Sequence, residues 1–253
     1  YFSPLASSSS VLNADEKQQG VVLVDIGSGT TEISIYQNKR LKHATVLNWG
    51  GDRITEDLRI GLDVTTEHAE ALKTRFGTAL HRLIDLNEVV LIPGIAGRKP
   101  SPISVKNVAI IIEERMKELA AIVMAEIQQT TQAQLLRGSI VLCGGGAQLP
   151  DLDDLFQKVT GLETRIGLPD ASAAFGLTTD IKDPAFATSI GLVQVYFDQI
   201  NAAEERNEDV PNIPSSTMTP PYKSKPKPPS IKDIFGRLVD SLVGSEGDDG
   251  GSY

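Results

Sequence analysis

The sequence predicts an α/β fold followed by a disordered tail that ends in an amphipathic helix. Within residues 1–200, short apolar runs that stop at glycines accompany one long stretch of helical periodicity. Seven of the 14 prolines fall within residues 204–229, where large apolar residues are nearly absent, so this segment cannot bury enough surface to fold. Apolar residues then return at helical spacing over 231–243.

Composition excludes several classes of protein. The 253 residues include 24 Lys and Arg against 33 Asp and Glu, a net charge of −9, which argues against nucleic acid as the main partner. A single cysteine excludes an intrachain disulfide and a cysteine zinc cluster, and it fits a reducing compartment. The sequence contains no apolar run of 18 residues, so it predicts no membrane-spanning helix. Because initiator Met and signal peptide are both missing, we expect a fragment.

A glycine-rich hairpin is predicted near the start of the chain. The apolar run 21–26 stops at Gly27, and residues 31–36 alternate in period two, which predicts two strands joined by a turn over 27–30. Consecutive N–H groups and hydroxyls in such a turn suit phosphate oxygens, although an ordinary hairpin turn is an equal alternative. Asp25 at the strand end could face a hydrated divalent cation. The candidate phosphate-binding residues are Gly27, Ser28, Gly29, Thr30 and Thr31.

Two familiar nucleotide motifs do not match this hairpin. The dinucleotide fingerprint needs a glycine where Glu32 stands, and it needs a helix where we predict a strand. The Walker A pattern needs a Gly-Lys-Ser/Thr sequence, which does not follow the turn.

The next predicted elements are helices and short strands. Residues 66–76 read as a helix that Gly77 ends, and residues 86–93 suggest a strand. Apolar residues at helical spacing predict a helix over 105–129, with Ser104 as its N-cap. Residues 139–143 read as a buried strand.

Two further features are candidate parts of a binding site. The strand at 139–143 leads into Gly144, Gly145 and Gly146, followed by Gln148; these glycines either admit a flat ring or supply an unusual backbone turn. Glu70 and Lys73 lie three residues apart on one helix face and could bracket the hydroxyls of a ribose, but a plain surface ion pair is the favoured interpretation of that pair alone. Cys143 is interpreted as a small core residue, and the three histidines, His43, His68 and His81, as surface or packing residues.

The order of these motifs resembles the second half of the actin/Hsp70/sugar-kinase ATPase superfamily, and in detail the bacterial cell-division FtsA family. The resemblance covers residues 3 to about 197. It rests on DIGSGTTEI (25–33), WGGDRIT (49–55), AEALK (69–73), CGGGAQLP (143–150) and DPAFATSIGL (183–192). Mild departures from the family pattern are Ser28, Glu32 and Asp52.

The resemblance implies one lobe of the two-lobed actin-like ATPase fold, with an inserted α/β subdomain. Residues 1–20 would be a remnant of the other lobe or a connector, residues 21–54 and 136–200 the sheet subdomain, and residues 55–135 the insertion. A disordered linker (201–229), an amphipathic helix (230–243) and an acidic disordered end (244–253) would follow.

The resemblance also implies ATP and Mg²⁺ as ligands. Residues 27–31 would hold the β- and γ-phosphates, Glu70 and Lys73 would hold the ribose, and residues 144–146 would line the adenine and ribose pocket. Gly51 and Gln148 would be further nucleotide-binding residues. Asp25 would face the Mg²⁺ shell through water. Hydrolysis would be slow at most, because half of the cleft belongs to the other lobe.

The partners implied by the resemblance are the C-terminal tail of tubulin-like FtsZ, further copies in an actin-like filament, and the cytoplasmic face of the cell membrane at the division site. Candidate FtsZ-tail contacts in the insertion are Arg98, Lys99, Lys106 and Arg115, each of which could equally be an ordinary exposed cation. A PilM-like pilus-assembly protein and a sugar kinase of the same superfamily are the alternatives. The tethered C-terminal helix argues against both.

The apolar residues of that helix form one stripe suited to a bilayer surface, with a partner groove or its own domain as alternatives. They are Ile231, Ile234, Phe235, Leu238, Val239, Leu242 and Val243.

Overall fold

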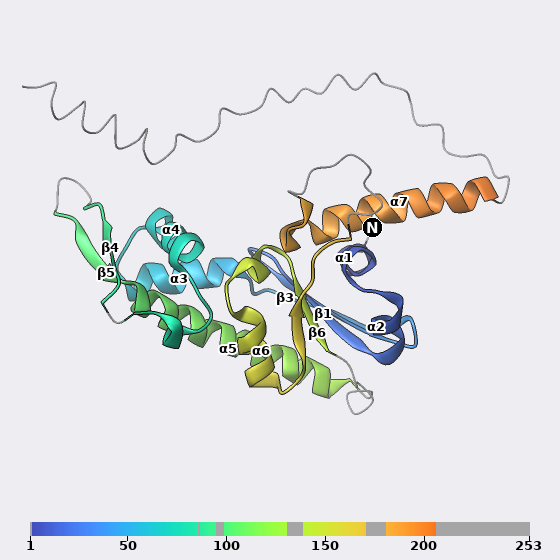
Figure 1. Cartoon of the computed structure of the whole chain (residues 1–253), viewed down its shortest axis with the longest axis horizontal. Helices are drawn as coiled ribbons and strands as arrows, with labels where there is room; N and C mark the ends of the chain where they lie inside the picture. Colours follow the sequence, from blue (N-terminus) through green and yellow to red (C-terminus); the bar gives the residue numbers. More distant parts are fainter. Residues whose placement is uncertain (1, 86, 95–98, 131–138, 171–180, 206–253) are drawn as a thin grey trace, which may run out of the picture. The chain divides into compact units, whose positions relative to one another are not determined.

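The computed structural model describes residues 2–85, 87–94, 99–130, 139–170 and 181–205 (Figure 1). Every described residue belongs to one compact unit, residues 1–208. The predicted amphipathic helix and acidic end therefore lie outside the described residues, as does most of the predicted linker. The last described helix, α7 (Ala187–Glu205), runs five residues into the segment that composition assigned to the linker.

A five-stranded sheet in the order β3-β2-β1-β6-β7 forms the centre of this unit. The strands are β1 (Val21–Ile26), β2 (Thr31–Gln37), β3 (Arg40–Leu47), β6 (Ile140–Cys143) and β7 (Thr164–Ile166). The predicted hairpin is confirmed: β1 and β2 pair antiparallel from Val21 opposite Tyr36 to Ile26 opposite Thr31. Strand β3 pairs antiparallel with β2, whereas β6 and β7 run parallel to β1. A two-residue turn at Asn38 and Lys39, both with positive φ, joins β2 to β3.

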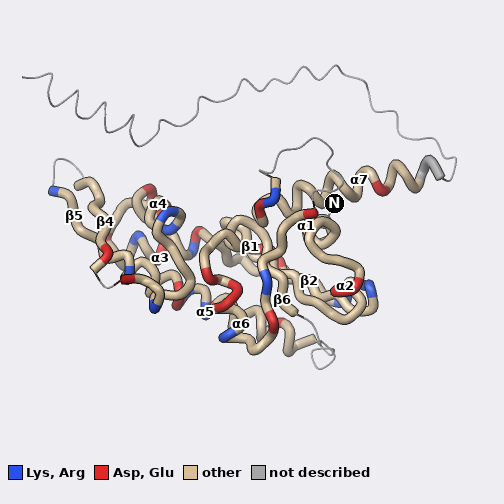
Figure 2. The backbone as a smooth tube through the Cα atoms, in the orientation of Figure 1, with Lys and Arg blue, Asp and Glu red and all other residues tan. Residues whose placement is uncertain are grey.

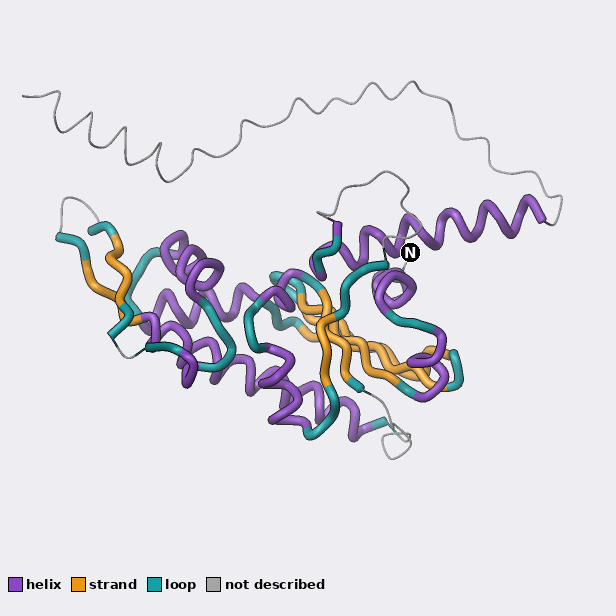
Figure 3. The backbone as a smooth tube through the Cα atoms, viewed as in Figure 1, coloured by secondary structure: helices purple, strands orange, loops and turns teal. Residues whose placement is uncertain are grey.

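Helices cover both faces of the sheet (Figure 3). Because side chains alternate along a strand, β1 sends Val22 and Val24 into one apolar cluster and Val21 and Leu23 into another. The first cluster includes residues of α5 (Val105–Gln129) and α6 (Leu152–Thr160). The second includes residues around α1 (Ser3–Val11) and the start of α7. The two-sided burial explains why β1 reads as a continuous apolar run.

The segment between β3 and β6 is mainly helical. It holds α3 (Gly51–Gly61), α4 (Thr66–Phe76), the short turn η1 (His81–Leu83), the hairpin of β4 (Val89–Ile92) and β5 (Ser101–Ser104), and α5. The predicted helix over 66–76 and its end at Gly77 are confirmed. Helix α5 begins after Ser104 as predicted, but the Ser104 side chain makes no capping hydrogen bond. Helix α5 packs against α3 and α4 and also against α6, so one apolar cluster extends from the helices between β3 and β6 to the central sheet.

The first residues of the chain, expected as a remnant or connector, form α1 and α2 (Ala14–Gln19). Helix α1 crosses α7 closely at Gly191. A Cβ placed on Gly191 would lie 1.8 Å from the carbonyl oxygen of Ala6. The Ser10 hydroxyl donates to the Ala187 carbonyl oxygen over 2.6 Å at the same contact. Helices α1 and α7 are therefore integral to the packing of this unit.

Two further features of the described chain concern its charges and its helices. Lys and Arg positions are interspersed with Asp and Glu positions along the backbone (Figure 2). Within the described ranges, every helix is too short or too polar to cross a membrane.

Candidate functional site

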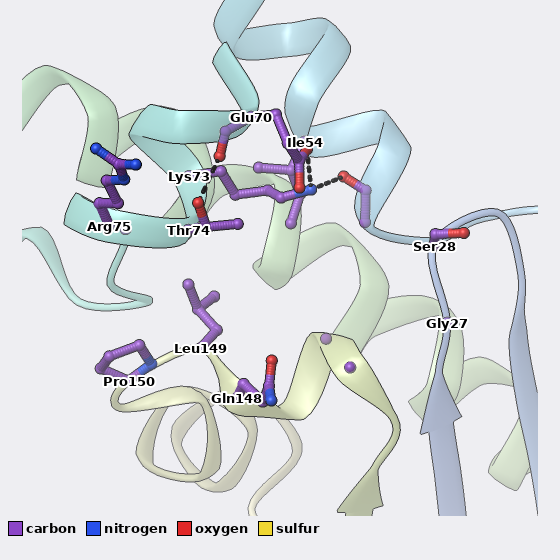
Figure 4. Close-up of a pocket in the computed structure, with 14 residues that line it drawn as sticks. Gly27, Ser28, Ile54, Glu70, Lys73, Thr74, Arg75, Gln148, Leu149 and Pro150 are labelled. Carbon is purple, nitrogen blue, oxygen red and sulfur yellow. Dashed lines mark hydrogen bonds and ion pairs between the residues drawn. The ribbon is translucent and has the colours of Figure 1, made fainter. Parts of the chain in front are cut away.

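Four separate parts of the chain line one pocket of about 400 Å³ (Figure 4). These are the β1–β2 turn, the start of α3, helix α4 with Gly77 at its end, and the loop after β6. Eight predicted binding residues lie on its wall: Gly27, Ser28, Gly51, Glu70, Lys73, Gly145, Gly146 and Gln148. The wall also includes residues that sequence reasoning missed, although each lies within a few positions of a predicted one: Ile54, Thr74, Arg75, Gly77, Leu149 and Pro150.

The β1–β2 turn is held against the start of α3 by backbone hydrogen bonds. The Gly51 N–H donates to the Gly27 carbonyl oxygen over 3.0 Å, and the Asp52 N–H donates to that of Ser28 over 2.8 Å. A Cβ on Gly50 would lie 2.4 Å from the Ser28 oxygen, so only glycine allows this approach. The N–H groups of Ser28 and Gly29 donate to no group within the described ranges. They remain available to an anion.

The last three residues of the predicted phosphate loop are placed differently from its first two. Thr31 is fully buried, and its hydroxyl donates to the Trp49 carbonyl oxygen over 2.7 Å. Thr31 therefore holds the loop before α3 and has no hydroxyl proton left for a ligand. Gly29 and Thr30 are exposed at the tip of the turn, outside the pocket wall.

The Glu70–Lys73 pair is an ion pair that lines the pocket, so the ion-pair interpretation is confirmed and the ribose-binding interpretation stays a prediction. Lys73 Nζ lies 2.7 Å from Glu70 Oε2 and donates to Thr55 Oγ1 over 2.8 Å and to the Gly51 oxygen over 3.1 Å. Burial raises the pKa of the Glu70 carboxyl, but hydrogen bonds from Lys73 and Thr55 outweigh it and leave the pKa below its ordinary value. The carboxylate is therefore ionised at neutral pH.

The glycines after β6 have distinct roles. Gly144 has φ of +83°, and a Cβ there would lie 2.4 Å from Asp25 Oδ1. A Cβ on Gly146 would lie 2.4 Å from Ile26 Cγ2, whereas one on Gly145 would meet no atom within 4 Å. The unusual backbone turn is therefore required at Gly144, which does not line the pocket, and open space lies at Gly145.

The loop after β6 contains the short helix η4 (Gly145–Gln148). The turn η7 (Pro184–Phe186) and the residue before it fix the shape of this loop. The Gly144 N–H donates to the Pro184 oxygen over 2.9 Å, and Gln148 Nε2 donates to Asp183 Oδ2 over 2.6 Å.

Asp25 lies at the end of β1 on the side of α1 and α7. Thr188 Oγ1 donates to its Oδ2 over 3.0 Å. Burial raises the pKa of the Asp25 carboxyl, and hydrogen bonds from Thr188, Ser7 and Cys143 partly offset this rise. Burial and the neighbouring Asp25 raise the pKa of the Cys143 thiol, which fits its interpretation as a core residue.

A protein-only metal site is missing from the part of the chain that the structure describes, since no three His, Cys, Asp or Glu side chains there could hold an ion together. Mg²⁺ usually keeps several waters and binds through one or two carboxylates together with substrate phosphates. Asp25 does not line the pocket and its Oδ2 accepts from Thr188, so its role toward Mg²⁺ stays a prediction.

A buried carboxylate that sequence reasoning missed supports the pocket from behind. Glu113 of α5 is 3% exposed; it accepts the His81 N–H over 2.8 Å, lies 2.6 Å from His81 Nδ1, and pairs with Lys117 at 2.8 Å. Burial raises the pKa of Glu113, but these hydrogen bonds prevail and lower it to about 2. The neighbouring Ala79 N–H donates to the Pro150 oxygen over 2.9 Å. The sequence signal was a glutamate on the apolar stripe of α5.

The four candidate FtsZ-tail contacts differ in their surroundings. Arg115 donates to both carboxylate oxygens of Asp57 and to Glu118, and it lies 5.9 Å from the centre of the Trp49 ring. This arginine therefore joins α5 to α3 and is a poor candidate for a partner contact. Lys99 and Lys106 have no ion pair among the residues described, and Arg98 lies outside them.

The fold of this chain is of the actin-like type. The structure resembles MreB5 of Spiroplasma citri bound to ADP, with a TM-score of 0.63 and 18% identity over 81% of this chain and 61% of that one. It also resembles a non-polymerising mutant of MamK bound to AMPPNP, with a TM-score of 0.56 and 19% identity over 76% and 57% of the two chains. At such identities the likeness concerns the fold alone.

The chain belongs to the FtsA family, since the model of Cell division protein FtsA matches residues 22–191. It is 35% identical over 189 residues to Cell division protein FtsA of Pseudomonas aeruginosa, covering 75% of this chain and 45% of that protein. It is 36% identical over 199 residues to that of Escherichia coli K12, covering 76% and 47%. The chain thus spans just under half the length of these relatives.

Proposed function

We propose that this chain is the ATP-binding lobe and membrane-anchoring tail of a cell-division scaffold that tethers FtsZ polymers to the cytoplasmic membrane. The observation that carries the proposal is the pocket, because it gathers eight predicted nucleotide-binding residues from four separate segments. FtsA-family membership supports the cell-division role. The solved relatives with ADP and AMPPNP support a nucleotide as the ligand.

In this proposal, the free N–H groups of Ser28 and Gly29 bind phosphate oxygens, Glu70 binds the ribose, and the face of Gly145 borders the adenosine. Asp25 orients water of the Mg²⁺ shell. Bound ATP supplies the phosphoanhydride that slow hydrolysis would cleave. The chain's own residues position and shield it, and the rest of the cleft belongs to the other lobe.

Replacing Gly145 tests the nucleotide assignment. Gly145 has open space where a Cβ would stand, so we expect Gly145→Val to fold normally and to lose ATP binding by occupying the pocket. Equilibrium dialysis with labelled ATP, on the longest natural form of the protein that contains this chain, measures the affinity. Gly161→Ala, whose Cβ would also meet no atom but which lies outside the pocket, controls for a general glycine effect, and it requires a thermal melt because its φ is +72°. Unchanged ATP affinity in a folded Gly145→Val protein would remove this loop from the site.

The insertion is proposed to bind the acidic tail of FtsZ through Lys99 and Lys106, with Arg98 as a third candidate. Charge reversal at Lys99 and Lys106 should weaken binding and its salt dependence together. Fluorescence anisotropy with a tail peptide measures this effect. Arg115 joins α5 to α3, so a loss of peptide binding in Arg115→Glu would report damage to that contact and not a lost contact with the peptide. A folded protein that binds no tail peptide would exclude FtsZ as a direct partner.

The stripe over residues 231–243 is proposed to lie on the bilayer as a helix. Phe235 and Leu238 lie near its middle, and burying each side chain contributes about 1.5–3 kcal/mol. Changing both to Asp should abolish co-sedimentation with vesicles, whereas doubling the salt should weaken it only modestly. Alignment of copies in an actin-like filament would strengthen the weak binding of each anchor. Retained co-sedimentation of the double variant would refute the anchor.

The PilM-like alternative rests on fold similarity. The chain matches the PilM–PilN type IV pilus biogenesis complex with a TM-score of 0.56 at 19% identity. FtsA-family membership and the stripe at 231–243 favour the cell-division role over pilus assembly.

A further inference from the structure

We propose that Thr55 is a positioning residue that aims the Glu70 carboxylate at the ribose and thereby sets the preference of the pocket for ribonucleotides over 2′-deoxyribonucleotides. This inference rests on the proposed nucleotide-binding function. The inference adds Thr55 to the site. Thr55 does not line the pocket, and it lies 15 positions along the chain from Glu70, whose carboxylate it orients.

Thr55 lies on α3 directly behind the Glu70–Lys73 pair of α4. It is 6% exposed, and its hydroxyl donates to Glu70 Oε2 over 2.6 Å. The oxygen of the Thr55 hydroxyl in turn accepts a hydrogen bond from Lys73 Nζ over 2.8 Å. One hydroxyl therefore contacts both members of the pair, and as a buried β-branched side chain it has few rotamers available. It fixes the carboxylate more tightly than an ion pair alone would.

The Lys73 ammonium is fully used inside the protein. Its three N–H donors match three acceptors within 3.1 Å: Glu70 Oε2, Thr55 Oγ1 and the Gly51 carbonyl oxygen. Its side chain is 15% exposed. Lys73 consequently holds α4 to the start of α3, and contact with the ribose falls to Glu70.

Glu70 is divided between a protein side and a ligand side. Both of its contacts within the described ranges use Oε2, whereas Oε1 has no partner there, and the side chain is 49% exposed on the pocket wall. An ionised carboxylate only accepts hydrogen bonds, so Oε1 suits a donor such as a ribose hydroxyl. A 2′-deoxyribose lacks one of the two neighbouring hydroxyls. Rotation of the carboxylate would weaken this discrimination, and Thr55 blocks that rotation.

The test compares the dissociation constants of ATP and 2′-deoxyATP, measured by isothermal titration on the longest natural form that contains this chain. A hydrogen bond to a charged acceptor predicts that wild type prefers ATP by about tenfold or more. We expect Thr55→Val to reduce this ratio toward one, and Thr55→Ser to keep most of it. A merely structural role would weaken both nucleotides equally and leave the ratio unchanged.

Two further comparisons keep the test decisive. Should Thr55→Val fail to fold, Thr55→Ser and Thr55→Ala differ only in the hydroxyl, and we expect only the alanine variant to lose the preference. Thr160→Val removes a buried hydroxyl of α6 that donates to the Phe156 oxygen and does not line the pocket, so it should not change the ratio.

The outcomes separate the two proposals. A wild-type protein that binds neither nucleotide would overturn the proposed function and the role of Thr55 together. ATP binding with the wild-type ratio in folded Thr55→Val or Thr55→Ala would overturn the role of Thr55 alone.

Discussion

Glu113 should make a measurable, pH-dependent contribution to stability. The perturbation is Glu113→Gln, which keeps the shape of the side chain and removes its charge. Glu113 is 3% exposed and receives a hydrogen bond from Lys117 of the same helix. It also accepts the His81 N–H, which connects α5 to the segment around η1. Removing the charge leaves the Lys117 ammonium without its buried partner, although Glu114 still pairs with it at 2.8 Å.

The magnitude follows from the shift in pKa. The carboxyl has a pKa of about 2 in the folded protein against an ordinary value of 4.5. Because one unit corresponds to 1.36 kcal/mol, the ionised group stabilises the fold by about 3 kcal/mol at neutral pH. The folded pKa is depressed, so this contribution is complete above pH 4.5 and is lost as pH falls toward 2. By linkage, about half of it remains at pH 3.

Urea unfolding of wild type and Glu113→Gln at pH 7, 5 and 3.5 measures the difference in free energy. We expect a difference of about 3 kcal/mol at pH 7 that shrinks as the pH falls below 4.5. Glu114→Gln is the matched control: Glu114 also pairs with Lys117, but its side chain is 66% exposed, so its removal should cost under about 1 kcal/mol. A difference that is the same at pH 7 and 3.5 would refute the assigned role of the carboxylate.

Three further predictions concern other parts of the chain. Arg115→Leu should lower the free energy of unfolding by about 1–3 kcal/mol, because it leaves half-buried Asp57 without its partner, and chemical denaturation measures this loss. Gly191→Ala should destabilise the fold by more than Gly145→Ala in thermal melts, because only the former places a Cβ against the α1 backbone; equal melting temperatures would contradict the close helix crossing. A peptide of residues 230–244 should be mostly unstructured in water and gain helix with vesicles by circular dichroism, and no gain on any lipid composition would favour a protein groove.

Local patterns were sufficient to predict several elements. The β1–β2 hairpin, helix α4 with its end at Gly77, and helix α5 each depend on periodicity and on glycine punctuation within one short segment. The binding motifs are local too, because glycines and small hydroxyl residues must be contiguous for a backbone to approach a ligand. Family membership followed from the order of those motifs along the chain.

Only the tertiary structure decided which polar groups remain free for a ligand. The sequence places Thr31, Lys73 and Arg115 in motifs that suit binding, yet their donors are taken by Trp49, by Thr55 and Gly51, and by Asp57. These acceptors lie between 18 and 58 positions away along the chain. A hydrogen-bond donor finds its partner among the groups that lie near it in the fold, which can be distant in sequence. A motif can therefore name a candidate residue. Only the packing of α3, α4 and α5 decides that the Lys73 ammonium is occupied while Glu70 Oε1 is free.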